Sequence, residues 1–324
     1  MRILVLTRFY LNGQTTHVLS LCSQLSRFGH QPYLAMANFH HPAYYQWLRS
    51  NKIQFTANTS FQALDQLAAK HRFELVHTHS SHTLDLALEL GRKHQIPVVA
   101  TCHYLDFQPL AKLCEADRII SISREMQETL ALPVQKTTTI ENGVNTTGFK
   151  PRLWQKQAPD QPLALIVTRM TDRKEPGYAE LVQALRKKGW RIKSVGNWRP
   201  ISLGLAYCGW QIELGEEYQK ADLVIGTGRA IREGMAAGAA ALVLGDYLDG
   251  IVTEENVELL RRFNFSSRAS RQVPDQENIA SELDKLTENR LRQLQEFSFH
   301  YAQKHFSEED MAKAVVEVYQ SCLA

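Results

Sequence analysis

The stretch ADLVIGTGRAIREGMAAGAAALVLG, Ala221 to Gly245, decides the fold of this chain. An apolar run leads into two glycines one residue apart, a helix-like segment follows, and a second apolar run ends the stretch. Continuous apolar runs are typical of strands in a parallel sheet, because both faces of such a sheet are covered. The stretch therefore predicts a strand–helix–strand unit. Its glycine turn places the first N–H groups of the helix where a phosphate could bind.

The same alternation of strands and helices extends through both halves of the chain. Strand-like runs in the first half are ILVLT (3–7), FELVHTH (73–79), PVVATCH (97–103), RIISIS (118–123) and TTTIENG (137–143). In the second half, LALIVTR (163–169) and RIKSVG (191–196) precede the opening stretch. After Gly13, four apolar residues share one helix face: Val18, Leu21, Cys22 and Leu25. We therefore expect α/β domains with doubly wound parallel sheets.

A polar, proline-rich segment separates the two halves. It reads PRLWQKQAPDQP, Pro151 to Pro162, and is typical of a linker. We therefore expect a first domain over residues 1–152 and a second over residues 153–306. Ser307 and the three acidic residues that follow it have the features of a helix start, so residues 307–324 are expected to form a last helix.

The composition is that of a soluble globular protein. The 324 residues are 44% hydrophobic and 22% charged, and the formal net charge is +3. A dedicated nucleic-acid-binding protein would usually show a concentrated basic face, so that class is not expected. No apolar run is long enough to span a bilayer. The five cysteines include no C-x-x-C pair, which favours reduced thiols in the cytoplasm.

Polar residues that directly follow strands are the candidates for a site, because ligands of open α/β sheets gather at the carboxyl ends of the strands. His77, His79 and His82 follow one strand, but no acidic residue or cysteine is adjacent to them, so we predict no metal site. The next strand ends in Cys102 and His103. Neighbours in a strand point to opposite faces, so a contacting thiol–imidazole pair is not expected, and His103 alone is the candidate.

Two cations follow the first strand of the second half. Arg169 ends the strand and Lys174 lies just before the next helix-like segment. Cations in this position can neutralise a diphosphate, and the alternative is ordinary surface charge.

The glycine turn supplies further groups for an anion. These are the backbone N–H groups of Gly226, Thr227 and Gly228. A dinucleotide-binding fingerprint would need a third glycine where Ile231 stands, and it would normally lie in the first unit of the chain. Glu233, about one turn into the helix, could accept hydrogen bonds from a ribose or only complement the helix dipole.

Taken together, these stretches resemble glycosyltransferases of family four, which have the GT-B fold and transfer sugars from nucleotide donors with retention. The matching stretches are residues 1–30, FELVHTHSS (73–81), IPVVATCH (96–103), ADRIISISREMQETL (116–130), TIENGVNTTGFKP (139–151), VTRMTDRK (167–174), EGMAAGAAALVLG (233–245) and FSEEDMAKAVVEVY (306–319). They cover nearly the whole chain in order. The resemblance implies two Rossmann-like domains facing a central cleft, with the helix at 307–324 completing the first domain.

The resemblance also implies roles for individual residues. It assigns the catalytic role to His103, Arg169 and Lys174, the last two as contacts to the donor diphosphate. It places the donor at Gly13, Gly226, Thr227, Gly228, Arg229 and Glu233, with the Glu233 carboxylate on the ribose. No cofactor or metal ion is implied, because cations and backbone amides stabilise the leaving diphosphate.

The implied activity is that of a hexosyltransferase in polysaccharide biosynthesis. The donor would be a UDP-sugar rather than a GDP-sugar, and the acceptor a glycan, a glycolipid or another surface polymer. The expected location is cytoplasmic, with a peripheral position at the inner face of a membrane as a further alternative. The segment FHHPAYYQWLRSNK (39–52) mixes aromatic and basic residues, which suits either contact with anionic lipid or packing in the domain core.

The glycine turn departs from the family pattern. Ile225 stands where the first of two family glutamates is expected, and Arg229 and Arg232 stand where apolar residues are common. The proline–serine segment that usually precedes this helix is missing. Three alternatives follow: a transferase with one glutamate, a nucleotide-sugar 2-epimerase of the same fold, or a degenerate partner that binds without catalysis. An epimerase would need paired carboxylates, which the sequence does not show.

Overall fold

The chain folds into two compact units. The computed structural model describes residues 1–39, 41–149, 161–197 and 205–324. Unit 1 comprises Met1–Gly143 and Glu308–Ala324, and unit 2 comprises Val144–Ser307. The expected boundary at residues 152 and 153 lies outside the described residues, as does most of the expected linker. The units divide earlier in the chain, between Gly143 and Val144.

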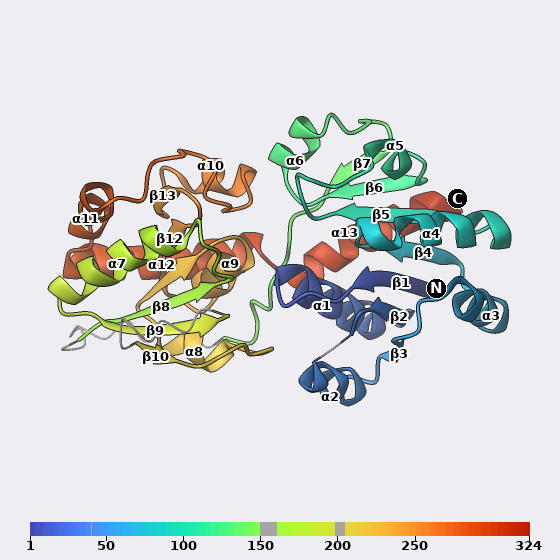
Figure 1. The fold of residues 1–324 in the computed structure, drawn as a ribbon, viewed down its shortest axis with the longest axis horizontal. Helices are drawn as coiled ribbons and strands as arrows, with labels where there is room; N and C mark the ends of the chain where they lie inside the picture. The colour runs from blue at the N-terminus through green and yellow to red at the C-terminus, as the bar shows by residue number, and fades with distance from the viewer. Residues whose placement is uncertain (40, 150–160, 198–204) are drawn as a thin grey trace. The chain divides into compact units, whose positions relative to one another are not determined.

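Unit 1 contains a parallel sheet whose strand order is β3-β2-β1-β4-β5-β6-β7 (Figure 1). Its strands are β1 (Arg2–Arg8), β2 (Gln31–Ala37), β3 (Gln54–Thr56), β4 (Leu75–Thr78), β5 (Val98–Cys102), β6 (Arg118–Ser121) and β7 (Thr137–Thr139). The order of the strands reverses between β1 and β4. In a doubly wound sheet, this switch point opens a crevice at the carboxyl ends of the strands.

Helices connect the strands of unit 1 and cover the sheet. They are α1 (Gly13–Arg27), α2 (Pro42–Ser50), α3 (Phe61–His71), α4 (Ser81–His94), α5 (Leu110–Leu113), α6 (Arg124–Thr129) and α13 (Glu308–Leu323). The predicted apolar face of α1, which carries Val18, Leu21, Cys22 and Leu25, is fully buried. The helix begins at Asn12, whose side chain accepts a hydrogen bond from the Gln14 N–H group, as a cap residue should.

The last helix, α13, belongs to unit 1, although the rest of that unit lies far away in the sequence. Met311, Val315 and Val318 bury the predicted apolar stripe, whereas Cys322 is half-exposed. The Glu308 carboxylate accepts hydrogen bonds from side chains of α1, including Gln24 Nε2 at 2.9 Å. At the other end, the Tyr319 hydroxyl is hydrogen-bonded to His77 Nδ1 at 2.6 Å.

We expect Tyr319→Phe to destabilise unit 1. The change leaves the buried His77 Nδ1 without its partner, and an unsatisfied buried polar group costs about 1–3 kcal/mol. Equilibrium unfolding in urea measures the change. Ser321→Ala, which removes a hydroxyl from the same helix at a less buried position, is the matched control. Equal stability of Tyr319→Phe and the native protein would contradict the anchoring role of this bond.

Unit 2 contains a second sheet with strand order β10-β9-β8-β11-β12-β13 (Figure 1). Its strands are β8 (Leu163–Thr168), β9 (Arg191–Gly196), β10 (Ala206–Tyr207), β11 (Leu223–Gly226), β12 (Ala240–Leu244) and β13 (Leu248–Ile251). All pair in parallel except β13, which lies antiparallel to β12. Here the strand order reverses between β8 and β11.

The helices of unit 2 are α7 (Glu175–Lys187), α8 (Gly215–Lys220), α9 (Arg229–Ala236), α10 (Val257–Arg262), α11 (Gln276–Asp284) and α12 (Glu288–His305). Helix α9 lies very close to the sheet. A Cβ atom added to Gly234 would come within 2.6 Å of the Val224 Cβ atom on β11. The glycine therefore permits this close packing of helix on strand.

The structure adds two observations on the bulk properties of the chain. All five cysteines are free. Among the residues that the structure describes, no helix combines the length and the apolar character that crossing a bilayer requires.

Candidate functional site

The predicted cations and the glycine turn of unit 2 lie at the same switch point of its sheet. Val167 on β8 pairs with Gly226 on β11, so the carboxyl ends of these strands are neighbours. Arg169 follows β8 directly, and the glycine turn follows β11. Ligands bind at such a point in open α/β sheets, so these residues form the candidate site of unit 2.

The loop after β8 is held in place by hydrogen bonds. Asn197 accepts a bond from the Met170 N–H group at 2.7 Å and donates one to the Met170 carbonyl at 3.2 Å. Lys174 Nζ donates to the Arg169 carbonyl at 3.2 Å. The Arg169 side chain is exposed, and that of Lys174 is half-buried. The loop therefore presents two cationic side chains from a fixed backbone.

The charges in this loop affect one another. Burial lowers the pKa of Lys174, the carboxylate of Asp246 opposes that shift, and the guanidinium of Arg169 adds to it. Arg173, by contrast, lies 3.6 Å from an oxygen of Asp246. Among the described residues, Arg169 forms no ion pair. Arg169 without an ion pair, next to the second cation Lys174, favours the binding of a multivalent anion.

The glycine turn requires its two glycines for different reasons, one for close packing and the other for its backbone conformation. A Cβ atom on Gly226 would lie 2.4 Å from the Val167 carbonyl oxygen, so only glycine fits there. Gly228 has a φ of 58°, in the left-handed region. Its N–H group donates to the Phe265 carbonyl at 2.8 Å. This bond corrects the expectation that the Gly228 amide is available to a phosphate.

Arg229 and Glu233 form an ion pair with each other on α9. Arg229 Nε lies 2.7 Å from Glu233 Oε1, and both side chains are largely buried. Sequence reasoning assigned each of them a separate contact to the donor. The structure instead couples them, so that Arg229 holds the carboxylate in one orientation. The coupling leaves one Glu233 oxygen outside this bond.

Arg232 is a buried cation that the sequence-based site did not include. Its side chain is 0% exposed, and its guanidinium lies 5.1 Å and 4.7 Å from the ring centres of Phe265 and Phe306. It donates to Asn264 Oδ1 at 3.1 Å. The Phe265 carbonyl accepts the hydrogen bond from the Gly228 N–H group. Arg232 therefore supports the turn indirectly, by packing against the Phe265 ring. The only signal of its role in the sequence was that an arginine stands at a position where apolar residues are common in the family.

Ile225 lies in the core of unit 2, not in the site. It is 0% exposed and stands in β11 between Ile166 on β8 and Leu242 on β12. Counting residues along the chain placed the first family glutamate at this position. The structure places a side chain at this position in an apolar cluster, where a glutamate would be buried without a partner.

In unit 1, the loop before α1 is tied to its neighbours. Gln14 Nε2 donates to the His79 carbonyl at 2.8 Å, and Asn12 Nδ2 donates to the Tyr104 hydroxyl at 3.2 Å. Gly13 is the first residue of α1, and it is not among the described glycines with a positive φ. The expected contribution of Gly13 is therefore the space left by its missing side chain. Its backbone conformation is not one that requires glycine.

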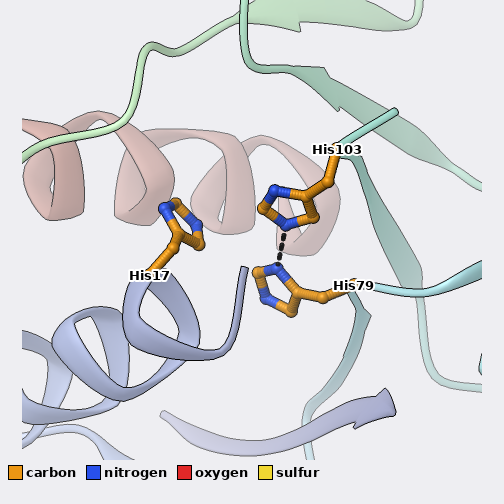
Figure 2. Close-up of side chains that lie close together, drawn as sticks. All are labelled: His17, His79 and His103. Carbon is orange, nitrogen blue, oxygen red and sulfur yellow. Dashed lines mark hydrogen bonds between the residues drawn. The ribbon is translucent and has the colours of Figure 1, made fainter. Parts of the chain in front are cut away.

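Three histidines gather where β4 and β5 end (Figure 2). His103 Nε2 lies 3.1 Å from His79 Nδ1, and the His17 ring on α1 faces both. Burial lowers the pKa of His103 to about 3 and that of His79 well below its ordinary value. The nitrogens of His77 are hydrogen-bonded to Thr101 and Tyr319, although its ring centre lies 4.0 Å from that of His79, and His82 is exposed. Sequence reasoning included His103 but missed its partner His17.

The Cys102 thiol is not a reactive partner of His103. Burial raises the pKa of Cys102 to about 12, and its Sγ atom donates to the Tyr104 carbonyl at 3.4 Å. The thiol is therefore protonated near neutral pH. The expectation that these neighbours do not form a thiol–imidazole pair agrees with this geometry.

Comparison with known proteins adds a family match and a fold. Residues 11–147 match the family model described as Glycosyltransferase Family 4. No curated protein matches the sequence significantly. HepE from Anabaena, solved with UDP-glucose, superposes with a TM-score of 0.75 at 14% identity, covering 99% of this chain and 100% of its own.

Two further solved structures show the same fold. A glycosyltransferase from Rickettsia africae has a TM-score of 0.72 at 17% identity and covers 99% of this chain and 98% of its own. UDP-GlcNAc 2-epimerase from Neisseria meningitidis, bound to UDP-GlcNAc, has a TM-score of 0.62 at 12% identity, with 99% and 100% covered. The chain is therefore similar to the family-four glycosyltransferases over residues 11–147 and has the GT-B fold of two α/β units.

Proposed function

We propose that this protein is a retaining glycosyltransferase that moves a sugar from a UDP- or GDP-sugar to a glycan, a glycolipid or another surface polymer. One observation carries the proposal. Arg169 and Lys174 project from a fixed loop at the β8–β11 switch point, beside the glycine turn. Two cations at the carboxyl end of a strand suit a diphosphate. The UDP-glucose bound to HepE, which has the same fold, favours UDP over GDP.

The proposed chemistry asks the site to stabilise charge on the leaving diphosphate. Arg169 and Lys174 would supply cations, and the N–H groups of Gly226 and Thr227 would supply further donors. We propose no metal ion at the diphosphate, because these groups suffice for the charge. Glu233, oriented by Arg229, would accept hydrogen bonds from the ribose hydroxyls. His103, with 8% of its surface exposed, would contact the transferred sugar or the acceptor.

Contact with a membrane is not part of the proposed activity. Phe39, Tyr44 and Leu48 of the aromatic segment are buried, and the Phe39 ring lies 4.1 Å from that of Tyr45. This arrangement favours the interpretation that the segment packs in its own unit. The exposed Arg49 is the basic group through which an anionic surface could still be contacted.

We expect UDP to raise the thermal stability of the protein. A ligand that binds only the folded state stabilises it by about 2.7 kcal/mol at a hundredfold excess over its dissociation constant. A panel of UDP, GDP, ADP and CDP, scored by melting temperature, measures the effect. Uridine is the matched control, because it lacks the diphosphate that Arg169 and Lys174 would bind. The proposal fails if no nucleoside diphosphate shifts the melting curve.

A nucleotide-sugar 2-epimerase is the second candidate, since an enzyme of that class shares the fold. The described carboxylates of the unit 2 site do not favour it. Glu233 is paired with Arg229, and Asp246 lies near Arg173 and Lys174, so no two acids face each other there. Incubation with UDP-GlcNAc separates the classes: an epimerase converts the free donor, whereas a transferase adds mass to an acceptor.

A further inference from the structure

His17, His79 and His103 come from three separate elements of unit 1 and converge on one point (Figure 2). His17 lies on α1, His79 follows β4 and His103 follows β5. One nitrogen from each ring lies within 4.8 Å of the other two. In a tetrahedral zinc site, bonds of about 2.0–2.1 Å imply ligand separations of about 3.4 Å. The nitrogens of His79 and His103 lie 3.1 Å apart, already near that spacing, so a rotation of the His17 ring would close the cluster.

The cluster is shielded from solvent, because all three side chains are more than nine-tenths buried. Burial lowers the pKa of His79 and His103, which favours the neutral form in which an imidazole binds a metal ion. Neutral imidazoles bind Zn²⁺, Cu²⁺, Fe²⁺ and Ni²⁺, whereas Mg²⁺ and Ca²⁺ require oxygen ligands.

The two ring nitrogens of His79 have different surroundings. The Nε2 atom of His79 is completely buried and has no hydrogen-bond partner among the described residues. Its other nitrogen, Nδ1, faces His103 Nε2. The nitrogen that faces the other rings is therefore Nδ1, and an ion in the cluster would take the place of its hydrogen bond to His103.

We propose that His17, His79 and His103 form a three-histidine site for one divalent transition-metal ion, with Zn²⁺ as the reference ion. The fourth position of a tetrahedral ion would hold water or a ligand oxygen. No carboxylate or thiolate belongs to the cluster, so the ion would keep its full charge and act as a strong Lewis acid. The site lies where β4 and β5 end, beside the β1–β4 switch point, where ligands of such sheets bind.

This site differs from the one that the sequence suggested and rejected. His77, His79 and His82 are neighbours in sequence, but His77 is bonded to Thr101 and Tyr319, and His82 is exposed. Only His79 belongs to the cluster. His103 belongs to both this site and the proposed transferase site, but metal binding is measured without any sugar donor, so a failure of one proposal is distinguishable from a failure of the other.

Cobalt titration of the untagged, chelator-treated protein tests the site. We expect one Co²⁺ per chain, with the visible absorption of a four-coordinate ion, and displacement by one Zn²⁺. His79→Ala should weaken binding by more than about 100-fold, since even the loss of an outer-shell partner costs 10–100-fold. His82→Ala, from the same segment but exposed, should bind as the native protein does.

The melting temperature of the native protein gives a readout that needs no variant. It should rise with Zn²⁺ and fall again with a chelator, because a metal ion held by three elements stabilises the folded state. Absence of stoichiometric Co²⁺ and Zn²⁺ binding by the native protein overturns the proposal. So does undiminished binding by a folded His79→Ala variant, or an equal loss in His82→Ala.

Discussion

Replacing Arg169 and Lys174 together by alanine is expected to lower the rate of sugar transfer by at least ~10²–10³-fold. Removing one preorganised group that stabilises developing charge typically costs that much. The two side chains project from a loop whose Met170 backbone is held by Asn197. The third cation of the loop, Arg173, lies beside Asp246. Since charge on the diphosphate increases as the sugar leaves, kcat should fall more than KM rises.

The matched control removes the same charge from the opposite edge of the sheet. Lys187 ends α7 and Arg191 begins β9, and both are exposed. Their joint replacement by alanine should leave transfer within about twofold of the native rate, because exposed charges more than a Debye length apart are screened. Transfer and donor hydrolysis are measured with each UDP-sugar that shifts the melting temperature. Native rates in the Arg169 and Lys174 double variant would show that the diphosphate binds elsewhere.

Ile225→Glu is expected to unfold unit 2 or to destabilise it by more than about 4–5 kcal/mol. A carboxylate in this position would be buried between Ile166 and Leu242, with no polar partner in the apolar cluster. An unpaired charge buried in a core is among the few changes that cost this much. Equilibrium unfolding and soluble yield measure the effect.

The control for this change is Ile225→Val. It removes one methylene group from the same place and should cost about 0.5–1.5 kcal/mol. If residue 225 were the lost first glutamate of the family, Ile225→Glu would instead fold normally and raise the transfer rate. That result would contradict the expectation that a carboxylate at residue 225 stays buried in the apolar cluster.

The buried position of Ile225 changes how the missing glutamate is understood. The strand runs directly into the glycine turn, and no acidic residue stands between Ile225 and Glu233. Glu233 is then the acidic group of the turn, and Arg229 fixes its orientation. A transferase with one glutamate and a degenerate binding partner both fit this arrangement. Turnover of the donor, compared with its binding, distinguishes them.

The sequence predicted much of the fold and part of the site. Continuous apolar runs marked the strands, and the residues after β8 and β11 were correctly placed at the ends of their strands, which the structure shows to be neighbours. These are local properties: a strand shows its burial in its own residues. The sequence did not reveal that the Gly228 N–H group donates a hydrogen bond to the Phe265 carbonyl, because Phe265 lies far along the chain.

By itself, the sequence determined two α/β halves, the strand ends that carry Arg169, Lys174 and His103, and the glycine turn after β11. It could do so because periodicity and turn chemistry act over a few residues. Only the tertiary structure decided which side chains meet. It joined His17 to His79 and His103, paired Arg229 with Glu233, and turned Ile225 into the core. Such contacts depend on strand register and helix packing, which bring together residues that no local pattern relates.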